Sequence, residues 1–346
     1  MKKQVLFISK NFIRMLVLLI FVSIGAFALV SMTPLDPLQT NVGQAALGSM
    51  SPEQIERLRL YWGEGIPPLN RYLAWAGDFA RGNMGTSLLY HQPVEKVIQI
   101  RFASSVWLMA AAWILSGVAG VILGMAAGAR KGSLADRVIS AYALVTASTP
   151  AFWVALVLLM VFAVWLKVLP VGLSVPIGAD AAAVSIADRI RHGILPAAAL
   201  SLTGISNITL HTREKMIQVM ESDYVLFARA RGESLGSIVF RHGLRNMILP
   251  ALTLQFASIS EIFGGSVLVE QVFSYPGLGQ AAVSAGLGSD IPLLMGITMI
   301  SAAIVFAGNF IADILYEIID PRMRKNSQKS KWMKDSGRTH QTGNER

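Results

Sequence analysis

Long apolar runs without charged residues alternate along the chain with polar segments. A helix needs about 20 apolar residues to cross the hydrocarbon core of a bilayer. Backbone groups in lipid must be hydrogen-bonded internally, and the runs lack the alternation of a membrane β-strand. The pattern predicts an all-α, polytopic membrane protein with about six transmembrane helices. The fourth run is short and the fifth carries Glu261. The predicted spans are Met15 to Met32, Val106 to Ala129, Val138 to Leu166, Ile194 to Leu210, Met247 to Leu268 and Ile291 to Ala312.

Composition supports the same class. Hydrophobic residues make up 53% of the chain and charged residues 15%, with a mean hydropathy of +0.52. A water-soluble domain of 346 residues does not need so much apolar sequence to build its core. The chain has no Cys, which excludes disulfides and thiolate metal sites. The five His residues show no metal-binding spacing, so no metal site is expected.

Basic residues gather in alternating polar segments. Most of the 30 Lys and Arg residues lie in the N-terminus, after the second and fourth spans, and in the C-terminal tail. The positive-inside rule therefore assigns both termini to the cytoplasm. The first span also resembles a cleaved secretory signal, because it contains Ala26-Phe27-Ala28. Its apolar run continues to Met32, which favours an uncleaved anchor.

These segments predict a division of the chain into four regions. Residues 1–32 form a cytoplasmic N-terminus and the first span, and residues 33–105 form an external segment. Residues 106–319 form a five-helix core that contains a polar cytoplasmic segment, residues 212–246. Residues 320–346 form a basic cytoplasmic tail, for which we expect disorder or contact with lipid headgroups.

The polar segment 212–246 interrupts two predicted spans. A protein that only sits in lipid has no use for a charged helical segment of this length, so we interpret it as a docking surface. Alternating apolar and basic positions suit a groove in a soluble partner. The alternative is a basic surface that lies on anionic headgroups. The positions concerned are Val225, Leu226, Ala228 and Ile238 together with Arg229, Arg231 and Arg241.

Capping residues divide this segment into two helices. Ser222 or Asp223 can cap a first helix that runs through Arg231, and Gly232 can end it in the left-handed conformation. Ser234 can cap a second helix that runs toward the end of the segment. The sequence predicts two short helices that meet at a glycine corner.

Two further patterns predict local structure. Ser51-Pro52-Glu53-Gln54 has a Ser cap, a Pro at the first helical position and a Gln that can reach back to the cap. We interpret the amphipathic helix that follows, with Ile55, Leu58 and Trp62 on one face, as a lid on the membrane rim, with substrate contact as the alternative. In the second span, glycines at short helical spacing predict close helix packing. They are Gly117, Gly120, Gly124 and Gly128.

The sequence lacks the motifs of common enzyme sites. No Gly-Lys dipeptide occurs, so a phosphate-binding GxxxxGK[ST] loop is excluded. The stretch 277–282 matches a loose GxGxxA pattern, but it follows a membrane span and not a strand, so we interpret it as a turn. We expect no enzyme activity and no cofactor in this chain. Energy for any transport must come from other subunits.

Two carboxylates lie within or near the predicted spans. Glu261 interrupts the fifth span, and a carboxylate at membrane depth is costly unless it pairs or faces water. It is either a pore-lining charge that meets a cationic substrate group or a carboxylate satisfied by a neighbouring helix or subunit. For Asp313, near the end of the sixth span, we favour a cap or a pairing near the membrane interface with the exit at Asp320-Pro321-Arg322.

Several motifs occur in fixed order along the chain: YVLFARARGES, RHGLRNMILP, VEQVFSYPGLGQAAVSA, DIPLLMG and NFIADILYEIIDPRMR. Together they resemble the permease subunits of bacterial ABC importers of the peptide, opine and nickel class. The resemblance extends weakly toward the N-terminus through SPEQIERLR, PAFW and LPVG and covers the chain from the first span to Arg324.

This resemblance implies a MetI-like helical core that pairs with a second, homologous permease subunit in the bacterial inner membrane. Two cytoplasmic ATP-binding subunits, an external solute-binding protein and membrane lipid are the other implied partners, and no nucleic acid is expected. The implied mechanism is alternating access with no covalent chemistry.

A coupling loop, often called the EAA loop, connects ATPase and pore in such importers. Its small position falls on Ala228, its glycine on Gly232, and Leu249-Pro250 closes the motif. The chain departs from the family pattern at Gly236, Ser237 and Glu261. Leu226 and Phe227 stand where other importers have the name-giving Glu and Ala, as is common in this class. The residues assigned to ATPase coupling are Tyr224, Ala228, Arg229, Ala230, Arg231, Gly232, Ser234 and Arg241.

The solute remains open among a dipeptide, an oligopeptide, a nickel complex and an opine-type chelate, because the binding protein usually sets specificity in this class. A channel or secondary transporter that works without an ATPase is a more distant alternative. Such transporters often carry an inverted repeat, and none is visible in the sequence.

Overall fold

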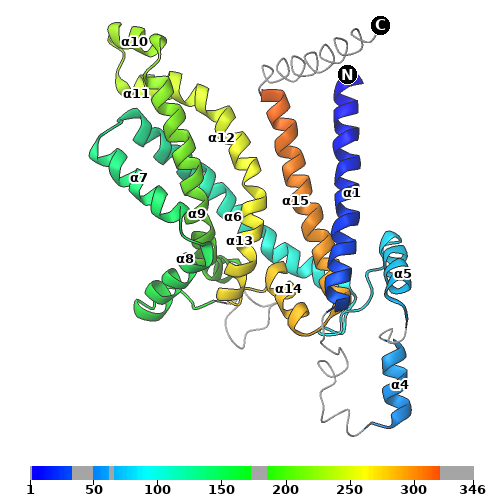
Figure 1. The fold of residues 1–346 in the computed structure, drawn as a ribbon. Coiled ribbons are helices and arrows are strands. Elements are labelled where there is room, and N and C mark those ends of the chain that lie inside the picture. Colours follow the sequence, from blue (N-terminus) through cyan, green and yellow to red (C-terminus); the bar gives the residue numbers. More distant parts are fainter. Residues whose placement is uncertain (1, 33–49, 62–65, 173–184, 320–346) are drawn as a thin grey trace, which may run out of the picture.

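The computed structural model is helical almost throughout (Figure 1). The residues it describes are 2–32, 50–61, 66–172 and 185–319. Among them there is no β-strand, and one isolated antiparallel bridge joins Thr86 and Pro93. The all-α prediction is confirmed. The predicted tail 320–346 and Trp62 lie outside the described residues.

Within the described ranges, the candidate membrane spans comprise four long apolar helices and two bent helix pairs. Counting each bent pair as one span gives six, in agreement with the prediction. The second and fourth spans are longer than their apolar runs, because helical structure continues into flanking polar residues. The long helices are α1 (Lys2–Met32), α6 (Val94–Ala129), α9 (Ile186–Met220) and α15 (Ile291–Ile319).

The third predicted span, Val138 to Leu166, is not one helix. Helix α7 (Leu134–Ala147) ends before Pro150, and α8 (Ala151–Leu158) begins after it. A π-helix (Leu159–Trp165) continues α8, and this second arm lies at 107° to α7. Proline lacks an N–H and disfavours helical conformation in the residue before it, which accounts for the corner.

The fifth predicted span, Met247 to Leu268, also bends. Helix α12 (Arg245–Ala257) and helix α13 (Ile259–Val272) meet at Ser258, where the direction changes by 46°. The Ser258 hydroxyl donates to the carbonyl oxygen of Gln255 at 2.8 Å. Such bonds to the preceding turn compete with the helical ladder and bend helices.

The glycines of α6 allow α9 to pack closely against it. A Cβ added to Gly124 would lie 2.6 Å from the Cβ of Thr212. A Cβ added to Gly120 would lie 2.7 Å from the Cβ of Ile208, and one added to Gly128 would lie 2.6 Å from the Cβ of Met216, both on α9. Gly117 faces Gln255 of α12 instead. These distances are shorter than atomic contacts allow, so the predicted packing role is confirmed for the stripe.

Shorter helices flank the spans. Helix α4 (Pro52–Tyr61) has the predicted reciprocal cap: the Gln54 backbone N–H donates to Ser51 Oγ at 3.3 Å, and the Ser51 N–H donates to Gln54 Oε1 at 2.9 Å. Helix α5 (Pro68–Ala80) follows it, and α14 (Leu278–Leu287) lies between α13 and α15.

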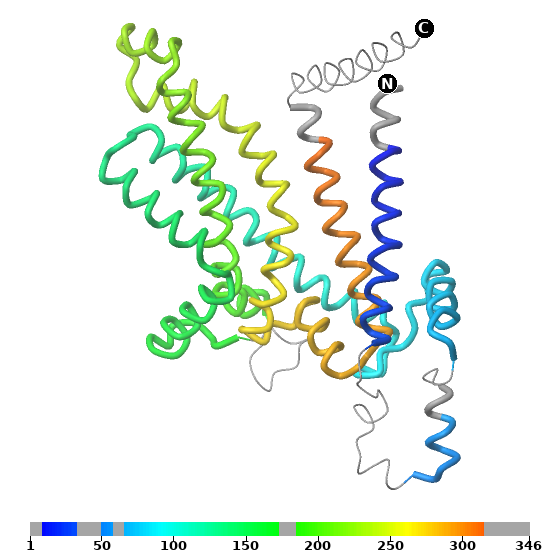
Figure 2. The backbone as a smooth tube through the Cα atoms, viewed as in Figure 1, coloured from blue at the N-terminus to red at the C-terminus, as the bar shows by residue number. Residues whose placement is uncertain are grey.

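Helices α10 (Asp223–Ala230) and α11 (Leu235–Ile238) lie at the same end of the molecule as the start of α1 and the end of α15 (Figure 1). Helices α4 and α14 lie toward the opposite end, as the tube in Figure 2 also shows. The basic segment, the start of α1 and the end of α15 therefore lie at one end of the molecule.

Candidate functional site

The basic segment is more helical than the sequence pattern indicates. Helix α9 continues to Met220, so its last turns occupy the first part of the segment 212–246. After α10 and α11, a π-helix (Val239–Leu244) leads directly into α12. The second predicted helix therefore does not stop near Asn246 but continues into the fifth span, so the basic segment and the membrane core share one helical stretch.

The corner between α10 and α11 forms at Gly232 as predicted. Gly232 has φ +82°, in the left-handed region that favours glycine. Its N–H donates to the Arg229 carbonyl oxygen at 2.9 Å, and the Glu233 N–H donates to the Ala228 carbonyl oxygen at 3.1 Å. These bonds satisfy carbonyl groups that the helix end would leave free.

The two predicted caps have different outcomes. Ser234 Oγ accepts a hydrogen bond from the Ser237 N–H at 3.4 Å, which confirms the cap of α11. Ser222 occupies the cap position of α10 but makes no side-chain cap bond. Its hydroxyl donates instead to the Val219 carbonyl oxygen at 2.5 Å, because the end of α9 is only a few residues away.

Helix α10 and its corner have a buried face and an exposed face. Val225, Ala228 and Ile238 are buried and pack in a cluster with Met216 of α9 and Met247 of α12. The exposed side combines large apolar and basic residues, as a protein-docking surface does. Its members are Tyr224, Leu226, Phe227, Arg229, Ala230, Arg231, Ser234, Phe240 and Arg241.

Side-chain contacts hold the corner together. Asn246 Nδ2 donates to the His242 carbonyl oxygen at 2.7 Å and to Tyr224 Oη at 3.4 Å. His242 Nε2 lies 3.6 Å from Glu233 Oε2. Of the predicted coupling residues, Tyr224 thus has an internal partner, which the sequence pattern did not indicate.

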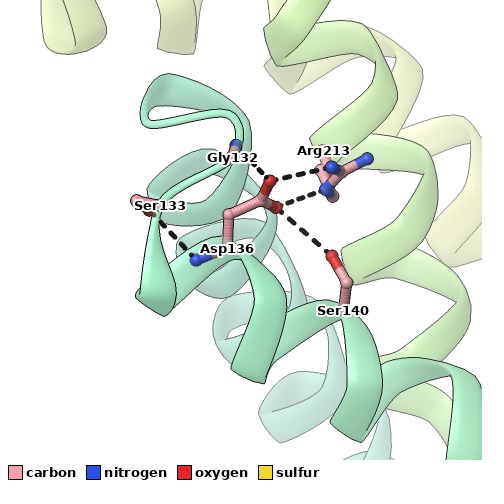
Figure 3. A network of polar contacts seen from close by, with 5 residues as sticks. All are labelled: Gly132, Ser133, Asp136, Ser140 and Arg213. Carbon is pink, nitrogen blue, oxygen red and sulfur yellow. Dashed lines mark hydrogen bonds and ion pairs between the residues drawn. The ribbon is translucent and has the colours of Figure 1, made fainter.

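A partly buried ion pair joins α7 to the part of the basic segment that belongs to α9 (Figure 3). The guanidinium of Arg213 donates from Nε to Asp136 Oδ1 at 2.5 Å and from Nη2 to Oδ2 at 2.9 Å. The carboxylate also accepts from the Gly132 N–H at 2.8 Å and from Ser140 Oγ at 3.3 Å. In the sequence, nothing distinguished Arg213 from the other basic residues of the segment. Asp136 carries a local signal, because it lies three residues after Ser133, which caps the start of α7.

Glu261 lies at the wall of a cavity of about 370 Å³. Both of its carboxylate oxygens lie 3.2 Å from Nδ2 of Asn207 on α9. Asn207 was missed in the sequence, although it is an amide within a predicted span. The other predicted carboxylate, Asp313, is exposed on α15, and the residues proposed to pair with it lie outside the described residues.

A second buried carboxylate was missed in the sequence. Glu270 of α13 accepts hydrogen bonds from Ser105 Oγ at 2.6 Å and from the N–H groups of Gly279 and Gln280 at 2.7 and 3.1 Å. It therefore caps the start of α14 from outside that helix. The signal for this role was the pair of glycines at the start of α14, since a Cβ at Gly277 would overlap the Glu270 carboxylate and a Cβ at Gly279 would lie 3.0 Å from its Oε2.

These features define a multi-pass helical membrane protein with a basic, largely helical segment exposed at one end. Residues 120–325 match the family described as binding-protein-dependent transport system inner membrane component. The chain therefore belongs to this family, and it is a permease subunit of an ABC importer.

Relatives along nearly the whole chain carry permease names. The chain is 34% identical to the oligopeptide transport system permease protein AppB of Bacillus subtilis over 92% of this chain and 98% of that protein. It is 33% identical to the di/tripeptide transport system permease protein DppB of Pseudomonas aeruginosa, over 88% and 94%. A putative peptide permease protein of Brucella ovis is 35% identical over 89% and 95%. The chain is thus a multi-pass protein of the inner membrane.

Proposed function

We propose that the chain forms half of the pore of a peptide importer and that α10 and α11 dock onto its cytoplasmic ATPases. The carrying observation is the exposed surface at the Gly232 corner, where Leu226, Phe227 and Phe240 are 68%, 65% and 74% exposed beside three arginines. Large exposed apolar side chains with Arg are typical of interfaces. A channel that works without partner subunits would not need an exposed surface of this kind.

The complex that we propose contains a second, homologous permease, two ATP-binding subunits and an external solute-binding protein. In this arrangement the basic segment, the start of α1 and the end of α15 face the cytoplasm, as the distribution of Lys and Arg favours. The peptide substrate is inferred from the printed names of the relatives, which include oligopeptide and di/tripeptide permeases. They favour a peptide over a nickel complex or an opine-type chelate.

The contacts supply a route for coupling. Movement of α10 would reach α9 through the buried cluster of Val225 and Ala228 with Met216. It would reach the fifth span through the helical continuity of α11 and α12. Closure of the ATPases would therefore move the fourth and fifth spans together, and the bend at Ser258 is the point in the fifth span where that motion can be absorbed.

Gly232→Val tests the coupling role. Val in the left-handed region costs about 1–2 kcal/mol, so the corner should open and ATP-driven uptake should fall sharply. The matched control is Gly236→Val, since a Cβ meets nothing within 4 Å at either glycine and only Gly232 has a positive φ. Uptake is measured in proteoliposomes with the binding protein and ATPases. Equal uptake by both variants at equal assembly would refute the coupling role.

Copurification tests the assembly itself. The detergent-extracted chain should bring down ATP-hydrolysing subunits, and Phe227→Asp on the exposed face should release them. If the chain conducts or exchanges solute without such subunits, the importer assignment of this complex is wrong and the channel alternative gains support.

A further inference from the structure

The Glu261 cavity lies where the two bent spans meet. Its residues come from the α7–α8 corner around Pro150, from α9, and from the α12–α13 bend at Ser258. Irregular backbone at membrane depth occurs where it is packed in protein or lines a water-filled cavity. Two bends meet at this one cavity, and this arrangement is compatible with a water-filled interior.

Hydroxyl and amide groups supply much of the cavity wall. Ser148 and Thr149 donate their hydroxyl hydrogens to the carbonyl oxygens of Leu144 and Val145 at 2.9 and 2.7 Å. Each hydroxyl oxygen retains acceptor capacity. The wall is thus rich in acceptors. Its polar members are Thr146, Ser148, Thr149, Thr203, Asn207, Ser258 and Glu261.

Glu261 is the charged group of this wall. It lies in the first turn of α13, where a helix favours negative charge. In the part of the chain that the structure describes, Asn207 is its hydrogen-bond partner, and it forms no ion pair there with Lys, Arg or His. A carboxylate offers about four acceptor sites, and Asn207 occupies two of them, so about half of the acceptor capacity of Glu261 is open to a ligand.

We propose that this cavity is a water-filled part of the translocation path and that Glu261 binds an organic ammonium group of the transported solute there. The inference rests on the proposed function and adds a charge preference to it. Asn207 acts as a positioning residue, because its amide fixes the carboxylate from the facing helix. A neutral Gln at position 261 could make the same contact to Asn207 without the cost of a charge, so the charge itself has a use in binding a cation.

The absence of Cys from the chain permits a direct test. Thr203→Cys places one thiol in the cavity wall, and Gly236→Cys places one on the basic segment, outside it. The assembled importer is treated with the cationic trimethylammonium-ethyl methanethiosulfonate and with its anionic sulfonato-ethyl analogue, with and without ATP. The rate of modification of this chain is followed by mass spectrometry. The ratio of the two rates reports the charge preference at each position.

We expect Glu261→Gln to lower the cationic-to-anionic rate ratio of the cavity thiol, in the Thr203→Cys background, about tenfold, because the cationic reagent loses its Coulombic attraction to the carboxylate. The ratio for the thiol of the Gly236→Cys protein should not change. Glu261→Asp keeps the negative charge and should retain the preference for the cationic reagent. Glu261→Ser serves as a second neutral variant if the Gln variant does not assemble. Asp313→Asn controls for the loss of a carboxylate elsewhere in the spans.

Two results would overturn the proposal. One is an unchanged rate ratio for the cavity thiol in the assembled neutral variants. The other is a cavity thiol that reacts with neither reagent, with or without ATP, while the thiol of the Gly236→Cys protein reacts, since the cavity would then not hold water. The labelling requires no knowledge of the solute. A negative labelling result would therefore overturn the role of Glu261, whereas loss of ATP-driven uptake would count against the proposed importer function.

Discussion

Glu270 shows how one buried carboxylate can hold three parts of the chain together. It is fully buried and receives hydrogen bonds from Ser105 on α6 and from two backbone N–H groups at the start of α14. Ser105 Oγ in turn accepts from the Leu278 N–H at 2.7 Å. A carboxylate in such a site is stabilising only while its donors are in place.

Glu270→Leu should destabilise the protein by about 3 kcal/mol or more, because it leaves several buried donors without an acceptor. The free energy of unfolding in detergent, or the midpoint of thermal unfolding, measures the effect. The control is Gln271→Leu, which makes a similar change at the next, exposed position. A Glu270→Leu protein as stable as the control would show that the network contributes no net stability.

At the scale of helices, apolar content predicted the number of spans but not their bends. Hydropathy averages over about 20 residues, so it does not register one Pro such as Pro150 or one back-bonded Ser such as Ser258. Helix α9 extends beyond its apolar run, because the residues after Leu210 remain helical and pack against α6. The Gly232 corner was predictable because a positive φ leaves a local signal, whereas the partners of Glu261 and Glu270 depend on which helices meet.

The glycine stripe of α6 gives a prediction at the same scale. Gly124→Leu places a side chain where a Cβ alone would lie 2.7 Å from the Thr209 carbonyl oxygen, so α9 must move away. We expect a marked loss of folded protein after extraction, measured by size-exclusion chromatography. Gly25→Leu on α1 is the control, because nothing lies within 4 Å of its Cβ position. Equal yields of the two variants would contradict tight packing of α6 on α9.

The whole molecule places the basic segment at the end where α1 starts and α15 finishes, and places the start of α6 toward the other end (Figure 1). Single cysteines in this cysteine-free chain can fix which end is cytoplasmic. Glu95→Cys, on an exposed position of α6, should react with a membrane-impermeant maleimide in intact cells. Gly236→Cys should react only after the membrane is permeabilised, because an ATPase-docking surface must face the nucleotide pool. The opposite labelling pattern would reverse the proposed orientation and remove the basis for ATPase docking at α10, whereas labelling of both sites in intact cells would show that the membrane had not remained sealed.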